Sequence, residues 1–331
     1  MTANAAKRLI EHYVDNFRHL PWRSSPGKPP PDPYRVWLSE VMLQQTTVAT
    51  VTPRFERFIE RWPTVERLAD ASDEEILSEW AGLGYYARAR NLIACAREVV
   101  KRGGFPRTAA GLRRLPGIGA YTSAAIAAIA FGEKAAAVDT NVERVIARLC
   151  GLRRPAREEV GRLTLDLMPE DRPGDFVQAM MDVGATICRP KNPHCRECPL
   201  AADCIAFASG EPEAFPRPQR RAARPHRHGI AYWTERGGSI WLIRRPAKGL
   251  LGGMAALPGT DWSEFGPEPN AIVTIRHVFT HFSLDLGIVA RSDPVGEGWW
   301  QPFDAIAEAG LPTLYRKAVQ AVLADRDRLA A

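Results

Sequence analysis

Residues 112–132, LRRLPGIGAYTSAAIAAIAFG, join a glycine-rich turn to a small, apolar helix. Pro116, Gly117 and Gly119 separate two helical stretches, so the turn can expose backbone N–H groups where the second helix begins. Such a helix end binds phosphate without a side chain, and glycine allows the close approach. A plain corner between two helices would have the same pattern, because glycine-rich helix connections are common. The apolar helix must be buried against others, which predicts a tight helical bundle.

Helical patterns extend from Ala5 to about Arg189, with Gly- and Pro-rich loops between them. The segment YRVWLSEVMLQQTTVATVTPRFERFIERW (34–62) has apolar residues at helical spacing, and we expect the chain to restart at Pro53. These patterns predict an all-α domain over residues 1–210.

The composition changes after Cys204. Residues 211–228, EPEAFPRPQRRAARPHRH, hold four prolines and five arginines without apolar periodicity, which predicts a basic linker. Beyond it, GIAYWTE and SIWLIRRP predict a β-hairpin around RGG, AIVTIRHV and FSLDLGIVAR predict two further strands, and LPTLYRKAVQAVLADRD predicts a final helix. We therefore expect a multidomain chain with an α+β domain over residues 229–331.

The charge balance favours a polyanionic partner without proving one. Lys and Arg number 44 and Asp and Glu 38, which gives a net charge of +6 in 331 residues. No apolar run of about 18 residues could span a membrane. The first residues resemble an amphipathic helix and not a secretory signal. We expect a soluble, cytoplasmic protein that does not bind membranes.

Four of the six cysteines lie close together, with the spacing Cys-x6-Cys-x2-Cys-x5-Cys. They are Cys188, Cys195, Cys198 and Cys204. Disulfides are rare in cytosolic proteins, so this loop is typical of metal ligation. Zinc and an iron–sulfur cluster both accept four thiolates, and the spacing alone leaves both open.

Glu40 lies in VWLSEVMLQQT, inside an otherwise apolar helical pattern. Apolar neighbours raise the pKa of a carboxyl group, so that it can hold and donate a proton near neutral pH. The alternative is an acid at the edge of a helix that pairs with an arginine, because most acids are solvated or paired.

Asp139 stands directly before the helical segment of AVDTNVERVIARL. Its ordinary role there is to cap the helix. Thr140 and Glu143 have the spacing of a capping box, however, and such a box would cap the helix without Asp139. We then expect a free carboxylate that the helix N-terminus keeps ionised.

These segments together resemble the endonuclease III superfamily of DNA glycosylases. LPGIG is similar to its helix-hairpin-helix, CRPKNPHCRECPLAADC (188–204) to its 4Fe-4S loop, and WLSEVMLQQT with GLGYYARARNL to its MutY branch. The resemblance implies one 4Fe-4S cluster on the four cysteines. It also implies a monomer that acts in base excision repair on double-stranded DNA, where it hydrolyses the glycosidic bond of adenine mispaired with 8-oxoguanine or guanine.

The resemblance assigns roles to particular residues. Glu40 would protonate N7 of the extruded adenine, Asp139 would stabilise the cationic sugar, and Asn141 would support it. The residues that would hold or wedge into the duplex are Gln44, Tyr85, Gly117 and Gly119. Those that would form the wall of the adenine pocket are Arg18, Leu20, Trp22 and Arg23 in the segment RHLPWR.

Tyr121 distinguishes two types of enzyme in this superfamily. Members that also cleave the strand carry a lysine two residues after the second glycine of the hairpin, and that amine forms a Schiff base with the sugar. This chain has Tyr121 there, and a phenol is not such a nucleophile, which favours a monofunctional glycosylase that uses water. Tyr121 would instead contact the cationic sugar. A strand-cleaving lyase and a non-catalytic DNA-binding scaffold are the alternatives.

KGLLGGMAALPG (248–259) resembles the C-terminal domain of the MutY branch, which shares its fold with Nudix hydrolases. The stretch DWSEFGPEPN (261–270) lacks the row of glutamates that binds magnesium, so we expect recognition and not hydrolysis. RHVFTHFSLD resembles the lesion-reading Phe-Ser-His loop, with Phe279, Thr280 and His281 in those places. Threonine keeps the hydroxyl of serine and adds a methyl group. Ordinary polar residues at a strand end are the alternative.

Overall fold

The structure is a computed structural model that describes residues 3–217, 223–246, 249–264 and 271–330. Two compact units are present. Unit 1 comprises Met1–Ala71 and Asn91–Arg220, and unit 2 comprises Ser72–Arg90 and Arg221–Ala331. None of the described helices is long and apolar enough to cross a membrane.

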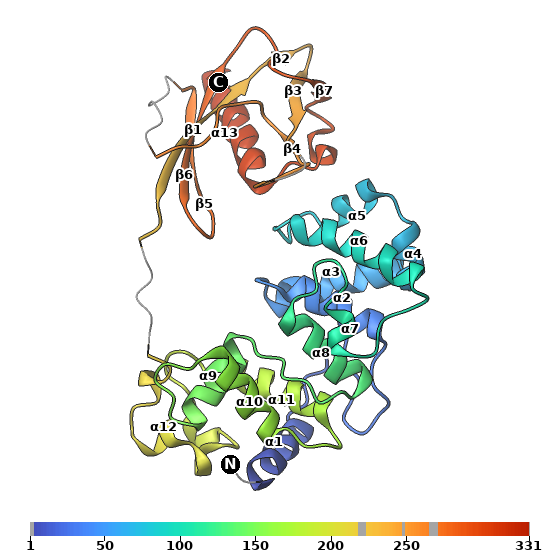
Figure 1. Ribbon diagram of the computed structural model, residues 1–331. Coiled ribbons are helices and arrows are strands. Elements are labelled where there is room, and N and C mark those ends of the chain that lie inside the picture. Colours follow the sequence, from blue (N-terminus) through green and yellow to red (C-terminus); the bar gives the residue numbers. More distant parts are fainter. Residues whose placement is uncertain (1–2, 218–222, 247–248, 265–270, 331) are drawn as a thin grey trace. The chain divides into compact units, whose positions relative to one another are not determined.

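Unit 1 is built from helices, as predicted (Figure 1). Its helices are α1 (Ala3–Asp15), α2 (Pro33–Leu43), α3 (Val48–Arg61), α4 (Val65–Asp70), α7 (Ala109–Leu112), α8 (Ala120–Phe131), α9 (Thr140–Leu149), α10 (Arg157–Leu167), α11 (Pro173–Thr186) and α12 (Ile205–Ala208), with the 3-10 helices η1 (Cys195–Glu197), η2 (Ala201–Asp203) and η3 (Pro212–Ala214). Helix α6 (Ala87–Lys101) begins in unit 2 and continues into unit 1.

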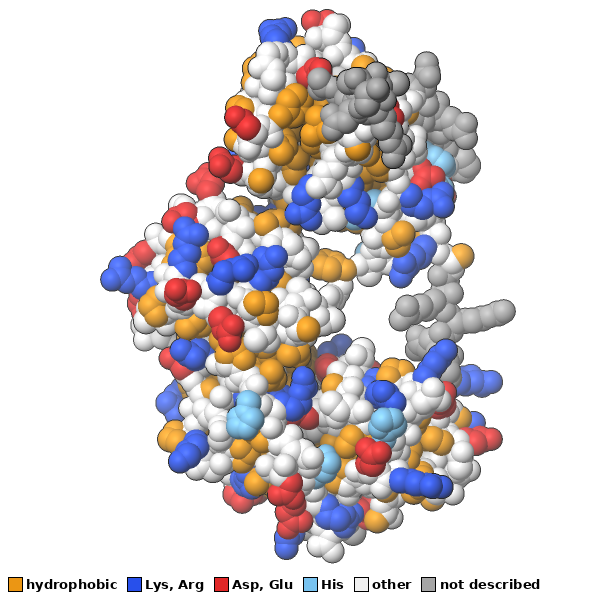
Figure 2. Space-filling view, turned by 180° about the vertical axis from the view of Figure 1, so that it is seen from behind, with side chains coloured by type: hydrophobic (Ala, Val, Ile, Leu, Met, Phe, Trp, Pro, Cys, Tyr) orange, Lys and Arg blue, Asp and Glu red, His pale blue; other side chains and the backbone are white. Residues whose placement is uncertain are grey.

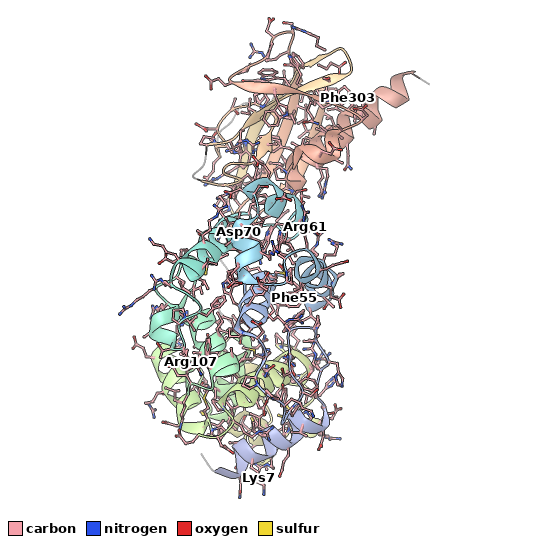
Figure 3. All side chains as sticks on the ribbon, turned by 90° about the vertical axis from the view of Figure 1, so that its right-hand side faces the viewer. Lys7, Phe55, Arg61, Asp70, Arg107 and Phe303 are labelled. Carbon is pink, nitrogen blue, oxygen red and sulfur yellow. The ribbon has the colours of Figure 1, made fainter. Side chains whose placement is uncertain are left out.

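The apolar helix α8 is buried along its length and packs against α2, α7 and α11 (Figure 1). Small residues permit this packing. A Cβ added to Gly174, in the first turn of α11, would lie 2.8 Å from the carbonyl oxygen of Ala128. Large side chains fill the remaining core of the unit. Phe55, labelled in Figure 3, is 1% exposed and meets Trp22 edge to face.

The break in the helical segment 34–62 lies earlier than we expected. Helix α2 ends at Leu43, and Thr47 caps α3 by accepting a hydrogen bond from the N–H of Thr50. Pro53 lies inside α3, so the prediction of a restart at Pro53 was wrong. The cap at Thr47 provides the start signal instead, since a threonine hydroxyl satisfies an N–H group that the first turn leaves free.

Unit 2 contains α5 (Asp73–Glu79) and two sheets. The first sheet has the order β1–β6–β5, and in the second β3 pairs with β2, β4 and β7. The elements are β1 (His226–Trp233), β2 (Glu235–Arg236), β3 (Ser239–Arg244), β4 (Ala255–Ala256), β5 (Val273–Val278), β6 (Ser283–Ala290), β7 (Gly298–Pro302), η4 (Ile306–Ala309) and α13 (Thr313–Ala330). Both sheets contribute to one core with α13, in which Ile240, Leu286 and Ala318 are fully buried.

The predicted hairpin of unit 2 is only partly correct. The turn at Gly237 and Gly238 joins β3 to the two-residue strand β2, whereas β1 pairs in parallel with β6 of the other sheet. The final helix and the α+β class are confirmed. Strand β1 already starts at His226, inside the segment predicted as linker. The domain boundaries at 210 and 229 stay predictions.

Candidate active site

A cavity of about 820 Å³ opens in unit 1 between the loop before α2, α2 itself, the glycine-rich turn, the start of α9 and the second half of α11. It brings together eleven of the residues that the sequence indicated. They are Arg18, Leu20, Trp22, Arg23, Glu40, Gln44, Gly117, Gly119, Tyr121, Asp139 and Asn141. The face in Figure 2 shows Lys and Arg interspersed with Asp and Glu, so the net positive charge is not gathered there into one patch.

Glu40 lies on α2 and is 7% exposed. Burial raises the pKa of this carboxyl group from 4.5 to about 7. A hydrogen bond with Tyr121 acts in the opposite direction, the charge of Asp139 adds to the rise, and Arg23 opposes it. The expectation of a raised pKa from apolar neighbours agrees with this environment. Glu40 can therefore hold a proton near neutral pH.

Tyr121 is the second residue of α8 and lines the cavity beside Glu40. Burial, and then the charges of Glu40 and Asp139, raise the pKa of its phenol well above the ordinary value. The phenol therefore stays protonated. Besides its hydrogen bond with Glu40, its hydroxyl lies 3.8 Å from Sδ of Met181.

The side chain of Asp139 caps α9, so the prediction that its carboxylate would be free of a capping role was wrong. Its Oδ1 accepts hydrogen bonds from the N–H groups of Asn141 and Val142, at 2.9 and 2.8 Å. The backbone of Asp139 is extended, as is usual for an N-cap residue, and this places the carboxylate over the free N–H groups of the first turn. Thr140 is already the first helical residue and is not in the capping position. Its Oδ2 accepts from the Asn141 side chain at 3.1 Å. The carboxylate thus lines the cavity in a fixed orientation.

Asn141 belongs to a network that the sequence did not indicate. Its Oδ1 accepts a hydrogen bond from Arg144 at 2.8 Å, and Arg144 also donates to the carbonyls of Gly184 and Cys188, at 2.6 and 2.7 Å. A Cβ on Gly184 would lie 2.6 Å from the Cβ of Asn141, so α9 and α11 approach closely here. These contacts fix the position of Asn141 and, through it, Asp139.

Asp182 on α11 holds two residues of the predicted pocket wall. It accepts hydrogen bonds from Arg23 at 2.6 and 3.0 Å and from Arg18 at 3.1 Å. The side chain of Arg23 is only 8% exposed, so this paired geometry neutralises a desolvated charge. An acid in the apolar stretch AMMDVGA is the signal that could have indicated Asp182. Gln178, one turn earlier, lines the same cavity.

The glycine-rich turn has the geometry of an N-terminal anion site. Gly117 has φ +72°, and a Cβ there would lie 2.6 Å from the Cβ of Asn91. Gly119 is the N-cap of α8, without a capping side chain, so the N–H groups of the first turn have no side-chain acceptor there. Such N–H groups attract phosphate oxygens.

Gln44 follows the last residue of α2 and donates to the hydroxyl of Thr122 at 3.4 Å. The next residue, Gln45, has φ +57°, which is rare for a residue with a side chain. Tyr85, in unit 2, has φ +48° and is 48% exposed. Strained, exposed residues of this kind gather at functional sites.

The predicted lesion-reading loop joins β5 to β6 in unit 2. Thr280 and His281 are exposed, whereas Phe279 packs with Trp262, His277 and Phe282. Within the same unit, the hydroxyl groups of Tyr85 and Thr280 are hydrogen-bonded to each other. The stretch 261–270, which we expect not to bind magnesium, lies partly outside the described residues.

Cys188, Cys195, Cys198 and Cys204 line one small cavity with Arg148. Among the described residues, no three of these sulfurs lie within 4.8 Å of one another. Zinc and a 4Fe-4S cluster both accept four thiolate ligands. Arg148 is 3% exposed and donates to Sγ of Cys188 at 3.4 Å, which suits negatively charged thiolates.

Two family models match the chain. The model of the HhH-GPD superfamily base excision DNA repair proteins matches residues 38–170, and that of the NUDIX domain matches residues 229–321. Among solved structures, a thermostable thymine-DNA glycosylase is similar, with 30% identity and a TM-score of 0.56 over 62% of this chain and 95% of that one. A trapped endonuclease III–DNA covalent intermediate has 26% identity and a TM-score of 0.54 over 63% and 99%.

Curated relatives match both parts of the chain. The adenine DNA glycosylase of Mus musculus is 31% identical over 93% of this chain and 76% of its own length. That of Buchnera aphidicola from Acyrthosiphon pisum is 32% identical over 85% of each chain. The Arabidopsis thaliana and Homo sapiens enzymes are both 36% identical over 77% of this chain, which spans 47% and 57% of their lengths, or about half.

Proposed function

The chain belongs to the adenine DNA glycosylase family, and from this premise we propose that it removes adenine opposite 8-oxoguanine or guanine in double-stranded DNA. The observation that carries the proposal is the buried Glu40, whose pKa is raised to about 7, with Asp139 in the same cavity of about 820 Å³. Enzymes that act on a base extrude it from the duplex into such a pocket. The enzyme works as a monomer, and none of its steps requires a membrane.

The two carboxyl groups divide the chemistry between them. As the glycosidic bond breaks, its electron pair leaves with adenine, and Glu40 gives its proton to the base at N7. Positive charge develops on the sugar, where the carboxylate of Asp139 stabilises it. Water then adds its hydroxyl to the sugar carbon, and the ionised Glu40 accepts the remaining proton. Asn141 positions Asp139.

Tyr121 makes the proposed reaction monofunctional. A strand-cleaving lyase needs an amine that attacks the sugar, and a protonated phenol beside Glu40 cannot form a Schiff base. Its hydrogen bond with Glu40 fixes the carboxyl group, and its ring is placed to contact the cationic sugar. Arg18, Leu20, Trp22 and Arg23 enclose the extruded base.

DNA contacts are proposed for two places. The N–H groups after Gly117 and Gly119 bind backbone phosphates, and Gln44 and Tyr85 fill the space that the extruded base leaves.

Catalysis belongs to residues 1–210, residues 211–228 act as a linker, and residues 229–331 recognise the opposing base. The proposed duplex-filling residue Tyr85 and the proposed recognition residue Thr280 both belong to unit 2, where their hydroxyl groups are hydrogen-bonded to each other.

The proposed function is tested by incubating the protein with duplexes that carry adenine opposite 8-oxoguanine, guanine or thymine. We expect free adenine and an abasic site with the first two, and an intact strand until alkali is added. Strand cleavage without alkali, together with a covalent adduct on borohydride treatment, would indicate a lyase. Duplex binding without any release of adenine would indicate a non-catalytic scaffold.

We propose that the four cysteines hold one 4Fe-4S cluster, whose role is to position the loop 188–204 and not to react. Cys188, Cys195, Cys198 and Cys204 would be its ligands, and the donor of each is a thiolate. Protein purified without oxygen is expected to be brown and to contain about four iron and four sulfide ions per chain. Stoichiometric zinc without iron would contradict this prediction.

The exposed hydroxyl of Thr280 is proposed to read 8-oxoguanine, with His281 beside it and Phe279 as the support of the loop. Replacing Thr280 with valine keeps the shape and removes the hydroxyl. We expect the ratio of single-turnover rates on 8-oxoguanine:adenine and guanine:adenine duplexes to fall by about tenfold or more, since a base contact contributes roughly 1–3 kcal/mol. The matched variant Thr280→Ser should keep the ratio. An unchanged ratio in the valine variant would exclude the hydroxyl as the reader.

A further inference from the structure

Three possible metal ligands meet in unit 2, and none of them has a role in the proposed reaction. One ligand atom each of His226, His228 and Asp285 lies within 4.8 Å of the other two, and all three side chains are half-buried. Strands β1 and β6 run in parallel here, with His226 paired to Ser283 and His228 paired to Asp285. Because alternate residues of a strand share one face, these four side chains project from the same face of the sheet.

The hydrogen bonds orient His226 as a ligand. Its Nδ1 lies 2.7 Å from Oγ of Ser283, and its Nε2 lies 3.1 Å from Oδ2 of Asp285. With a metal ion bound, Nδ1–H would donate to the hydroxyl and the Nε2 lone pair would bind the ion, which would replace the proton between Nε2 and the carboxylate; partners of this kind orient histidine ligands in metal sites. Two ligands of a tetrahedral zinc ion lie about 3.3 Å apart, because the bonds are 2.0–2.2 Å long. The His226–Asp285 spacing matches this value.

Asp285 is oriented in a similar way. Arg276 donates to both of its oxygens at 2.8 Å, which leaves the remaining lone pairs for other partners. The guanidinium also adds a positive charge, and this charge disfavours cations that bind through carboxylate charge alone. Magnesium and calcium, which prefer several oxygen ligands, fit the site poorly. Two imidazoles and one carboxylate are a donor set that suits zinc.

We propose that His226, His228 and Asp285 bind one zinc ion, with the fourth coordination position open to water. The imidazole of His228 turns toward the other two ligands to complete the site. The ion would join the start of β1, where the chain enters the second domain, to β6. Since β6 begins two residues after His281, the ion would also hold the base of the loop Phe279–His281. The site stands independently of the glycosylase activity.

The test uses the full, untagged chain with its cysteine loop loaded with iron, freed of loosely bound metal by EDTA and then titrated with zinc. Calorimetry and elemental analysis are expected to show one zinc ion per chain in addition to the iron. His228→Gln and Asp285→Asn should each abolish this binding, and Ser283→Ala should weaken it by about tenfold, as loss of an orienting partner does. Hydrogen exchange in residues 279–290 should slow on zinc addition in the unsubstituted chain alone.

Two matched variants act as controls. Arg227→Gln changes the residue between the two histidines. The side chain of Arg227 lies over the ring of Phe282. His12→Gln removes an imidazole from unit 1. Both should bind zinc like the unsubstituted chain, and the apo forms of all variants should unfold cooperatively, which shows that each is folded. The proposal is overturned if the unsubstituted chain takes up no more zinc than His228→Gln, or if Asp285→Asn retains the ion.

Discussion

Asp139→Asn is expected to lower the single-turnover rate of adenine excision by about 10²–10³-fold or more, because it removes a charge aimed at the developing cation. Mismatched duplex should still bind. Asparagine and aspartate cap helices equally well, so the amide can keep the hydrogen bonds to the N–H groups of Asn141 and Val142. The variant therefore separates the effect of the charge of Asp139 on catalysis from the role of its side chain as the N-cap of α9.

Asp32→Asn is the matched control for this prediction. Asp32 caps α2, the helix that carries Glu40, and accepts a hydrogen bond from the N–H of Tyr34. The same chemical change at this cap should alter the excision rate by less than about twofold, since asparagine replaces aspartate with little loss as a cap. Excision near the unsubstituted rate in Asp139→Asn would leave Asp139 as a cap and no more.

Glu40→Gln should likewise lose excision, by about 10²–10⁴-fold, because the amide cannot donate a proton to the departing base. The pH profile of the unsubstituted chain provides a second readout. With a pKa of about 7, Glu40 is mostly protonated below pH 7, so the rate should be level there. Above pH 7 the rate should fall by about tenfold per pH unit. The residual rate of Glu40→Gln should lack this dependence.

The stability of the same variant distinguishes a catalytic loss from a folding defect. The folded-state pKa of Glu40 lies above the unfolded value of 4.5, so this group costs the folded state free energy as pH rises from 4.5 through 7. The cost approaches about 3 kcal/mol at high pH. Glu40→Gln should therefore melt at the same or a higher temperature at pH 8.

An excision rate of the unsubstituted chain that does not change with pH, measured while chemistry limits turnover, would contradict Glu40 as proton donor.

Features that depend on neighbouring residues could be predicted from the sequence. Apolar residues around Glu40 on its own helix already indicate burial and hence a raised pKa. The glycines of the turn predict a close approach to the start of the next helix, and the cysteine spacing predicts a shared metal. In these cases the interaction lies within a few turns of chain, so the periodicity of helices and the φ preferences of glycine determine the outcome.

Competing local signals were not resolved by the sequence. Asp139 and Thr140 are both good N-caps, and their order in the chain does not say which one the backbone brings over the open N–H groups. The extended conformation of Asp139 decides in its favour. Similarly, Thr47 and Pro53 both mark a helix start, and the turn after Leu43 decides for Thr47.

The sequence by itself determined the helical bundle, the α+β second domain, the four-cysteine loop and the acid at Glu40, because each depends on a local pattern. Only the tertiary structure decided which distant groups meet. Asp182 accepts hydrogen bonds from Arg18 and Arg23, which lie 164 and 159 residues earlier in the chain, and His226 meets Asp285 through the parallel pairing of β1 and β6. Residue spacing does not encode strand partners or register, since these follow from how buried faces fit together once the chain has folded.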